Sequence, residues 1–559
     1  MAALENMGFI AIMASMVMYL MEVLFFNLSH AATTVTNFVG SAFLLSVVGG
    51  FISDAFMTRL NTILIFGALE VVGLGMLAMQ AHDKRLQPKA CLNFHCLKGH
   101  KATYFYSTLA VLALGSGGTR GVLPALGADQ FDQKDPKERK QMASYFNFLL
   151  LSVTVGASFG VTAIVSVSTD KHLGWAIGFF ISMLSALMGF IVLASGKPFY
   201  RGRLPGQAPI IRVLQVLVAA VKNRKLPLPE DSNELYEVHE KDEREASVIH
   251  ERISHSDQFR LLDKAAILPE GSYPQPWKVC TVTQVEEVKI LTRMMPIIAS
   301  TIIMNTCLAQ LQTFSILQGN FMDPYLGKIK VPAPSIPVIP LVFMSILIPI
   351  YDFIFVPFAR KITGHPTGIT HLQRVGIGLV LSAISMTVAG FVEVKRKNAF
   401  NYNFTKISLF WLSFQFSIFG IADMFTLVGL LEFFYSEAPA GMRSLSTSFS
   451  WLSLSLGNFL SSVFVEVINR VTKKTTKNKT GWLYGDNLNA NHLELFYWFL
   501  AVLSCLNFVN YLYWAKWYKH KEEVKGYEEV KEKSVDIPME PIKVVSGDAT
   551  TTKQELQLS

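Results

Sequence analysis

The feature that most constrains how this chain can fold is a series of long apolar segments separated by polar ones. A helix needs about 20 mainly apolar residues to cross the hydrocarbon core of a bilayer. Twelve segments of the 559-residue chain meet this requirement: 7–27, 34–56, 60–81, 103–126, 142–167, 173–195, 288–315, 334–358, 374–394, 407–434, 443–470 and 493–517. Since lipid offers no partner to unpaired backbone groups, these segments predict an all-α polytopic membrane protein with about twelve transmembrane helices.

The composition agrees with a chain whose main solvent is lipid. Hydrophobic residues make up 51% of the chain and charged residues only 16%, whereas soluble domains carry about 25% charged residues. The formal net charge is +8, and the basic residues lie in loops between the apolar segments. This placement favours the lipid bilayer as the neighbour and argues against nucleic acid as a partner.

A polar stretch divides the apolar segments into two groups of six. We therefore predict an N-terminal six-helix half (1–195), a cytosolic linker (196–287), a C-terminal six-helix half (288–518) and a disordered cytosolic tail (519–559). Two six-helix halves are the layout of the major-facilitator fold. In that fold the substrate site lies between the halves, near the middle of the bilayer.

Within the linker, residues 209–226 are apolar but carry the basic side chains of Arg212, Lys222, Arg224 and Lys225. This pattern fits an amphipathic helix that lies on the inner leaflet. A linker helix packed against the bundle explains the pattern equally well, so both alternatives stay open.

Three sequons for N-glycosylation indicate the orientation of the chain. They begin at Asn27, Asn403 and Asn478. In the twelve-span arrangement all three follow odd-numbered spans and therefore lie on one face of the membrane. Because N-glycosylation occurs outside the cytosol, both termini and the linker are expected in the cytosol.

Two of the five cysteines, Cys91 and Cys96, share one short loop with His95 between them. A zinc site would need a second pair of ligands at a recognisable spacing, and the sequence offers none. A disulfide is the better interpretation if this loop lies outside the cytosol. We expect neither a metal nor a cofactor.

A charge pattern after the second span is repeated after the eighth. Asp54 and Arg59 lie in the first copy, and Asp352 and Arg360 lie in the second. Each copy places an acid near a helix end and a base in the following turn. Such a pair can fix a short loop or can act as a gate, and the sequence does not choose between these roles.

Ionisable side chains inside a span cost about 2.5–3.5 kcal/mol on insertion scales, so they need a partner or a watery cavity. Arg120 lies in a glycine-rich segment, where small residues let neighbouring helices approach closely, and its guanidinium suits planar anions. Asp423 is a carboxylate that can take up and release a proton when its surroundings alternate. Glu70, in the middle of the third span, serves either helix packing or function.

Several segments together resemble the plant nitrate/peptide transporter family, which is part of the proton-coupled oligopeptide transporters. The resemblance covers nearly the whole chain and is closest to the branch that contains abscisic acid and nitrate carriers. The segments that carry it are NFVGSAFLLSVVGGFISDAF (37–56), LGSGGTRGVLPALGADQFD (114–132), FRLLDKAAI (259–267), PWKVCTVTQVEEVKILTRMMPI (276–297), YDFIFVPFARKITGH (351–365) and LEFFYSEAPAGMRS (431–444).

The resemblance implies roles for particular residues in the first half, and the chain departs from the family pattern there. The family's first helix usually carries an ExxER proton-coupling motif, but residues 2–6 keep only its second acid, Glu5. The fourth-helix lysine of the family is replaced by Arg120. We expect Glu5 and Arg120 to keep a reduced salt-bridge switch. The chain also begins where relatives are already inside their first helix, so we expect a cytosolic N-terminal stretch to be missing.

The second half departs from the family pattern as well. A histidine linked to nitrate in some members corresponds to Leu308, and the polar Gln310 lies beside it in the same segment. The tenth-helix glutamate of the family corresponds to Asp423. The aromatic stretch 410–419 would suit a pocket for an apolar organic acid, and core packing explains it equally well.

The sequence thus predicts a secondary transporter that moves a small anion together with protons by alternating access. The resemblance implies nitrate or an organic acid such as abscisic acid as the solute, and the plasma membrane as the location. An uncoupled uniporter or a substrate-binding sensor is the alternative, because the ExxER motif is reduced. Since no nucleophile elbow or phosphate-binding loop is present, we do not expect an enzyme, and no oligomeric state is indicated.

Overall fold

The structure of the protein is a computed structural model. Every described helix and strand lies in one structural unit, Met1–Tyr518. The residues that the structure describes are 1–89, 96–131, 136–170, 174–201, 209–229, 234–237, 253–268, 273–275, 277–363, 369–437, 443–474, 481–484, 488–489 and 491–518.

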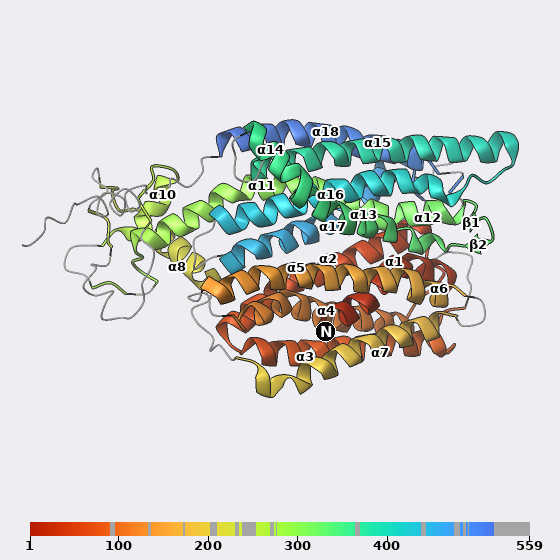
Figure 1. Ribbon diagram of the computed structural model, residues 1–559, viewed down its shortest axis with the longest axis horizontal. Helices are drawn as coiled ribbons and strands as arrows, with labels where there is room; N and C mark the ends of the chain where they lie inside the picture. Colours follow the sequence, from red (N-terminus) through yellow and green to blue (C-terminus); the bar gives the residue numbers. More distant parts are fainter. Residues whose placement is uncertain are drawn as a thin grey trace, which may run out of the picture. The chain divides into compact units, whose positions relative to one another are not determined.

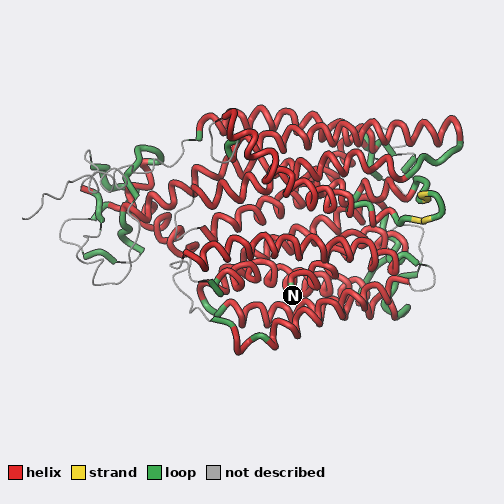
Figure 2. The backbone as a smooth tube through the Cα atoms, in the orientation of Figure 1, coloured by secondary structure: helices red, strands yellow, loops and turns green. Residues whose placement is uncertain are grey.

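The unit is built almost entirely of helices that run along one common direction (Figures 1 and 2). Those before the linker lie in the lower part of Figure 1 and those after it in the upper part. The first group consists of α1 (Ala2–Glu22), α2 (Leu28–Ala55), α3 (Arg59–His82), α4 (His100–Ala128), α5 (Pro136–Phe159), a π-helical turn (Gly160–Ile164), α6 (Val165–Ser168) and α7 (Gly174–Ser195).

The linker and the second group follow in the same manner. The linker contains α8 (Pro209–Lys222), α10 (Arg260–Asp263) and a short 3-10 turn (Lys264–Ala266). The second group consists of α11 (Val282–Gln312), α12 (Phe314–Asn320), α13 (Val338–Ile350), a π-helical turn (Tyr351–Phe355), α14 (Val356–Thr363), α15 (His371–Asn403), α16 (Leu412–Glu437), α17 (Arg443–Thr472) and α18 (Leu493–Trp517). Two short antiparallel strands, β1 (Tyr325–Leu326) and β2 (Ile329–Lys330), form a hairpin near α12 (Figure 1).

Eleven helices within the described ranges are long and apolar enough to cross a membrane. They correspond to all the predicted spans except the eighth, which we placed at residues 334–358. That segment is helical without a gap, but it is divided into α13, the π-helical turn and α14. Pro349 and Pro357 lie on either side of the turn, and each lacks the backbone N–H that a continuous helix would use. The all-helical membrane fold is confirmed, and the eighth span is a helical segment with a π-helical turn inside it.

Side-chain caps explain where several of these helices begin. Thr281 and Thr370 each form a capping box with a glutamine three residues later, at the starts of α11 and α15. Asn27 accepts a hydrogen bond from the backbone N–H of His30 at the start of α2. These bonds satisfy donors that a helix start leaves unpaired, so the helix starts are fixed by local sequence.

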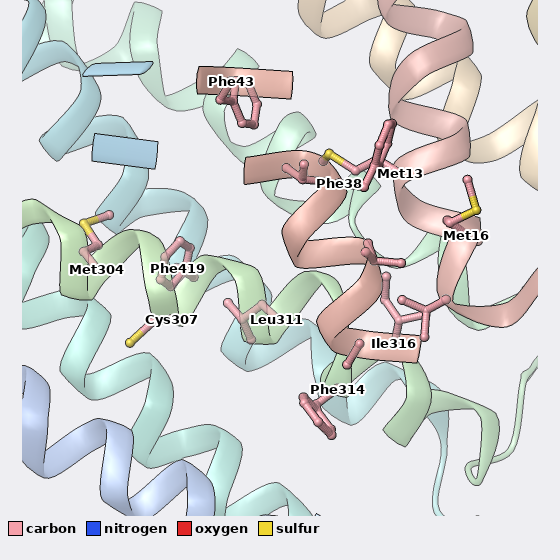
Figure 3. Packing of buried hydrophobic residues seen from close by; sticks show 14 of the residues in the cluster. Met13, Met16, Phe38, Phe43, Met304, Cys307, Leu311, Phe314, Ile316 and Phe419 are labelled. Carbon is pink, nitrogen blue, oxygen red and sulfur yellow. The ribbon is translucent and has the colours of Figure 1, made fainter. Parts of the chain in front are cut away.

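The two halves meet along α2 and α17. The hydroxyl oxygens of Thr36 and Ser462 lie 2.6 Å apart across this contact, and Ser455 donates to the backbone oxygen of Gly40 at 2.7 Å. Buried apolar side chains of both halves belong to one cluster. Figure 3 shows part of it, with Met13 and Phe38 of the first half and Leu311 of the second.

The linker helix α8 packs one apolar face against the start of α11. Val216, Ala219 and Ala220 are buried there with linker residues and with Val285 and Val288. This face of α8 therefore packs against the bundle, which is one of the two alternatives that the sequence left open. A second apolar face, with Leu214, Leu217 and Val221, is exposed, and its contact with the inner leaflet stays a prediction.

A buried network of charges also holds the linker on α11. Lys289 is fully buried, and its ammonium contacts Asp263 Oδ1, Glu286 Oε1 and the backbone oxygen of Ser256, each at 2.7 Å. The Ser256 hydroxyl donates to Glu286 at 2.7 Å, and Arg293 donates to the same hydroxyl at 3.1 Å. Two segments of the family resemblance, 259–267 and 276–297, thus meet at this network.

The described residues include Cys96 of the predicted disulfide and the whole side chain of only one of the three sequon asparagines. Cys96 is disulfide-bonded, as the sequence predicts, while Cys91 lies outside the described residues. Asn27 is only 4% exposed and caps α2, which argues against a glycan in this conformation, and the sequon stays a prediction. The side chain of Asn403, at the end of α15, and all of Asn478 lie outside the described residues, so these two sequons stay predictions.

Candidate functional site: a buried carboxylate–guanidinium cluster

A buried ion pair joins α1 to α4 inside the N-terminal half. Arg120 Nη2 donates to Glu5 Oε1 over 2.7 Å, and the two side chains are 10% and 3% exposed. The second carboxylate oxygen of Glu5 accepts from the Asn6 amide at 2.7 Å. Charge-assisted hydrogen bonds are short and strong, and low dielectric surroundings strengthen them further. The structure thus brings together the two residues that the sequence paired as a switch.

The ion pair with Glu5 does not use all of the hydrogen-bonding capacity of the Arg120 guanidinium. Its carbon Cζ lies 3.8 Å from the centre of the Phe9 ring, as in a cation–π contact. Its Nε is buried and has no hydrogen-bond partner among the described residues. Because a buried donor without a partner is unfavourable, an oxygen acceptor that reached this nitrogen would be stabilised.

A third ionisable residue, Glu70 of α3, lies beside this pair. It is only 2% exposed. Its carboxyl group is within hydrogen-bonding reach of Glu5, and it interacts electrostatically with Arg120. The site therefore contains two carboxyl groups and one guanidinium from three different helices.

Glycines in α4 explain how these helices come so close. A Cβ atom at Gly115 would overlap the backbone of Glu70, and one at Gly121 would overlap the backbone oxygen of Ser46 in α2. Only glycine leaves the space for this backbone contact. The prediction that the glycine-rich segment lets neighbouring helices approach closely is confirmed.

The predicted site residues of the C-terminal half lie on α11 and α16. Gln310 is fully buried, its Nε2 donates to Ser461 at 2.6 Å, and its Oε1 has no partner within the described ranges. Leu308 packs against the apolar cluster. Asp423 is partly exposed and follows the buried Phe419 by one helical turn, so both side chains lie on the same face of α16.

The two sets of residues are not joined to each other. No hydrogen bond or ion pair in the described part of the chain connects Glu5 and Arg120 with Gln310 or Asp423. The two halves also touch at the end of the helix bundle opposite to the linker. There Ser335 donates to the backbone oxygen of Val161 at 2.8 Å.

In the paired-charge pattern, Arg59 makes contacts that the structure describes. Arg59 forms an ion pair with Asp129 at the end of α4 and donates to the backbone oxygen of Ala125 at 3.2 Å. Both partners belong to the same half, which favours a role in fixing α3 against α4. Arg360 is exposed, and the side chains of Asp54 and Asp352 lie outside the described residues, so a gating role for this pattern stays a prediction.

Comparison with known proteins decides the family. The model of the POT family, PTR2, matches residues 60–483. Among similar proteins of Arabidopsis thaliana, Protein NRT1/PTR FAMILY 4.3 is 43% identical over 523 residues, covering 92% of this chain and 88% of the relative. Protein NRT1/PTR FAMILY 4.5 is 41% identical and covers 92% and 91%. The chain belongs to the POT family.

Solved POT family structures share the fold. An auto-inhibited POT family peptide transporter aligns with a TM-score of 0.68 at 18% identity, covering 94% of this chain and 97% of the other. The POT family transporter PepTSo aligns with a TM-score of 0.67 at 19% identity, covering 92% and 96%. As a POT family member with eleven described apolar helices, this protein is an integral, multi-pass membrane transporter.

The sequence did not assign Glu70 to the site of this POT family protein. Its position in the middle of an apolar span marked it as unusual, but two roles stayed open. Only the structure shows that α3 packs against α4 at this level, which places Glu70 beside Arg120 and beside Glu5 of α1. The contact of Phe9 with the guanidinium had no signal in the sequence.

Proposed function

We propose that this POT family protein carries a small planar monoanion together with a proton, by alternating access. The observation that carries the proposal is the buried Glu5–Arg120 ion pair, with its unpaired Arg120 Nε. Nitrate and organic carboxylates are planar anions that a guanidinium can bind through two parallel hydrogen bonds. Both nitrate and an organic acid such as abscisic acid are therefore candidate solutes.

Competition for Arg120 provides the coupling in this proposal. An ionised Glu5 holds the guanidinium, so an incoming anion has to displace it. When Glu5 takes up a proton, its attraction for Arg120 falls and the guanidinium is free to bind the anion. A ligand that favours one state in this way shifts the population of conformations by its differential affinity. Proton and anion therefore bind together.

In the same proposal, residues of the C-terminal half line the side of the solute-binding site opposite to Arg120. Asp423 lacks a hydrogen-bond or ion-pair partner among the described residues, and Gln310 has a free acceptor oxygen. Partly satisfied polar groups in a transporter interior are candidates for solute or water contact. By contrast, Phe416 and Phe419 of the aromatic stretch are buried in the apolar cluster. Core packing therefore accounts for these two residues without a ligand.

We also propose that both termini and the linker lie in the cytosol of a plasma-membrane protein. The disulfide of Cys96 supports this orientation. Disulfides persist in oxidising surroundings and are rare in the cytosol. Cys96 lies between α3 and α4, on the same side as the three sequons in the twelve-span arrangement, so the other side is the cytosolic one.

Uptake of labelled nitrate and of labelled abscisic acid tests the proposal. Oocytes that express the full chain are assayed at acid and at neutral outside pH, with surface labelling to confirm the amount of protein. Acid-stimulated uptake of either solute supports proton-coupled anion transport. Uptake that follows the solute gradient and ignores pH contradicts the coupling and favours a uniporter. Saturable binding without any flux favours a sensor.

A further inference from the structure

Glu70 occupies a position that general helix packing does not require. It is the only acidic residue of α3 and lies midway between Arg59 and His82. The side chain is 2% exposed, although carboxylates inside a span are unfavourable unless a partner or water stabilises them. A residue of this kind in a transporter is a candidate for a part in ion or proton movement.

The groups that face Glu70 come from two other helices. α1 contributes Glu5, which itself faces the amino group of Met1, and α4 contributes Arg120 and the hydroxyl of Thr119. The helix α7 also packs against α3, but its residues include no ionisable side chain. Arg120 is therefore the one guanidinium facing two carboxyl groups in the described part of the site.

The positions of the three groups assign different roles to the two acids. Glu5 forms the direct 2.7 Å ion pair with Arg120. Glu70 forms no ion pair with any residue that the structure describes, yet its carboxyl group is within hydrogen-bonding reach of Glu5. Two carboxyl groups hydrogen-bond to each other only when one of them carries a proton. Because the paired acid is stabilised in its ionised form, the proton belongs on the other acid.

We propose that Glu70 is the proton donor to Glu5: it holds a proton while Glu5 is paired with Arg120. This inference rests on the proposed proton-coupled transport and names a further residue for it. When Arg120 turns to the arriving anion, the O–H bond of Glu70 breaks and an O–H bond forms on Glu5. A hydronium ion from the solution then protonates Glu70 again. One proton is thus taken up for each monoanion, and the site keeps the same net charge.

The state of Glu70 can be tested without any transport assay. The purified full chain is studied by infrared spectroscopy at neutral pH in H2O and in D2O, which shifts the carbonyl stretch of a protonated carboxylic acid. We expect this band in the wild type and its loss in Glu70→Gln. Glu466→Gln is the matched control, because Glu466 is an exposed residue of another helix. A spectrum of Glu70→Gln that still contains the whole band would overturn the proposal.

A transport measurement then separates proton donation from a merely structural role. Proteoliposomes containing wild type or Glu70→Gln are assayed for proton-driven uptake and for counterflow of labelled nitrate and abscisic acid. Counterflow exchanges solute without net proton movement. We expect Glu70→Gln to lose the acid stimulation and keep counterflow. Acid stimulation equal to that of the wild type would contradict proton donation by Glu70.

Two further outcomes of these experiments separate a failure of the role of Glu70 from a failure of the proposed function. If Glu70→Gln does not fold, Glu70→Asp replaces it, and a shifted carboxylic acid band supports the same assignment while an unshifted band contradicts it. If the wild type shows no acid-stimulated uptake, proton-coupled transport fails and proton donation fails with it. The infrared band then still decides whether Glu70 holds a proton.

Discussion

The Glu5 carboxylate and the Arg120 guanidinium meet at 2.7 Å although 115 positions separate them in the chain. Each is the partner that makes the other tolerable inside a membrane. Removing one leaves the other buried without compensation, which is more harmful than the absence of both. This relationship makes single and paired substitutions at the two positions informative.

Arg120→Ala is expected to abolish anion uptake. Removing a buried hydrogen-bonded charge costs about 2–5 kcal/mol of binding, so affinity should fall by about 30-fold or more. Uptake of labelled nitrate or abscisic acid, normalised to surface protein, measures the effect. Arg120→Lys is the matched variant and should recover part of the activity, since a lysine keeps the charge but not the two-pronged geometry. Unchanged uptake by Arg120→Ala at equal surface expression would exclude the assigned role.

Glu5→Gln is expected to remove the acid stimulation of uptake. A glutamine cannot take up a proton and does not hold the guanidinium as an ionised acid does. Arg120 should then be free for the anion at neutral pH as well as at acid pH. The pH profile of uptake should become flat, with Glu466→Gln as a control that keeps the wild-type profile. A Glu5→Gln profile that rises at acid pH as in the wild type would rule out Glu5 as the coupling acid.

The sequence was sufficient for the fold because lipid makes length and hydropathy decisive. The hydropathy did not reveal the π-helical turn in the eighth span, which Pro349 and Pro357 flank. The ion pair of Glu5 with Arg120 was predicted only through the resemblance to a family. Its exact geometry depends on close helix contacts, such as that of Gly115 with the backbone of Glu70.

The limits of the sequence are clearest at Asn27 and Glu70. A sequon records only three residues, so it does not reveal that Asn27 is buried as the cap of α2. Glu70 was visible as an acid in an apolar span, but its neighbours lie on α1 and α4, far away in the chain. Long-range contacts of this kind follow from helix packing, which no local pattern encodes.

Asp423→Asn tests whether the C-terminal half takes part in coupling. If Asp423 takes up a proton during the cycle, the asparagine variant should lose part of the acid stimulation, because an amide does not titrate. The ratio of uptake at acid and neutral pH is the quantity to measure. A ratio equal to that of the wild type would show that Asp423 is not a coupling acid and would leave the coupling to the N-terminal half.

Lys289→Met tests the charge network that holds the linker on α11. The ammonium is fully buried and contacts Asp263 and Glu286, each at 2.7 Å. Methionine removes the charge but keeps a side chain of similar length, so Asp263 and Glu286 lose the cation between them, and Glu286 keeps Arg293 as a cationic partner, at 3.4 Å. Breaking a buried ion pair in this way costs about 3–5 kcal/mol.

We therefore expect a clear fall in the melting temperature of the purified Lys289→Met protein. The matched control is Lys278→Met, because Lys278 is an exposed lysine of the same linker region, and its melting temperature should stay close to that of the wild type. Equal melting temperatures for all three proteins would show that the network contributes little to stability. A fall that disappears in acid solution would identify the repulsion between Asp263 and Glu286 as the cause, since protonating these acids removes it.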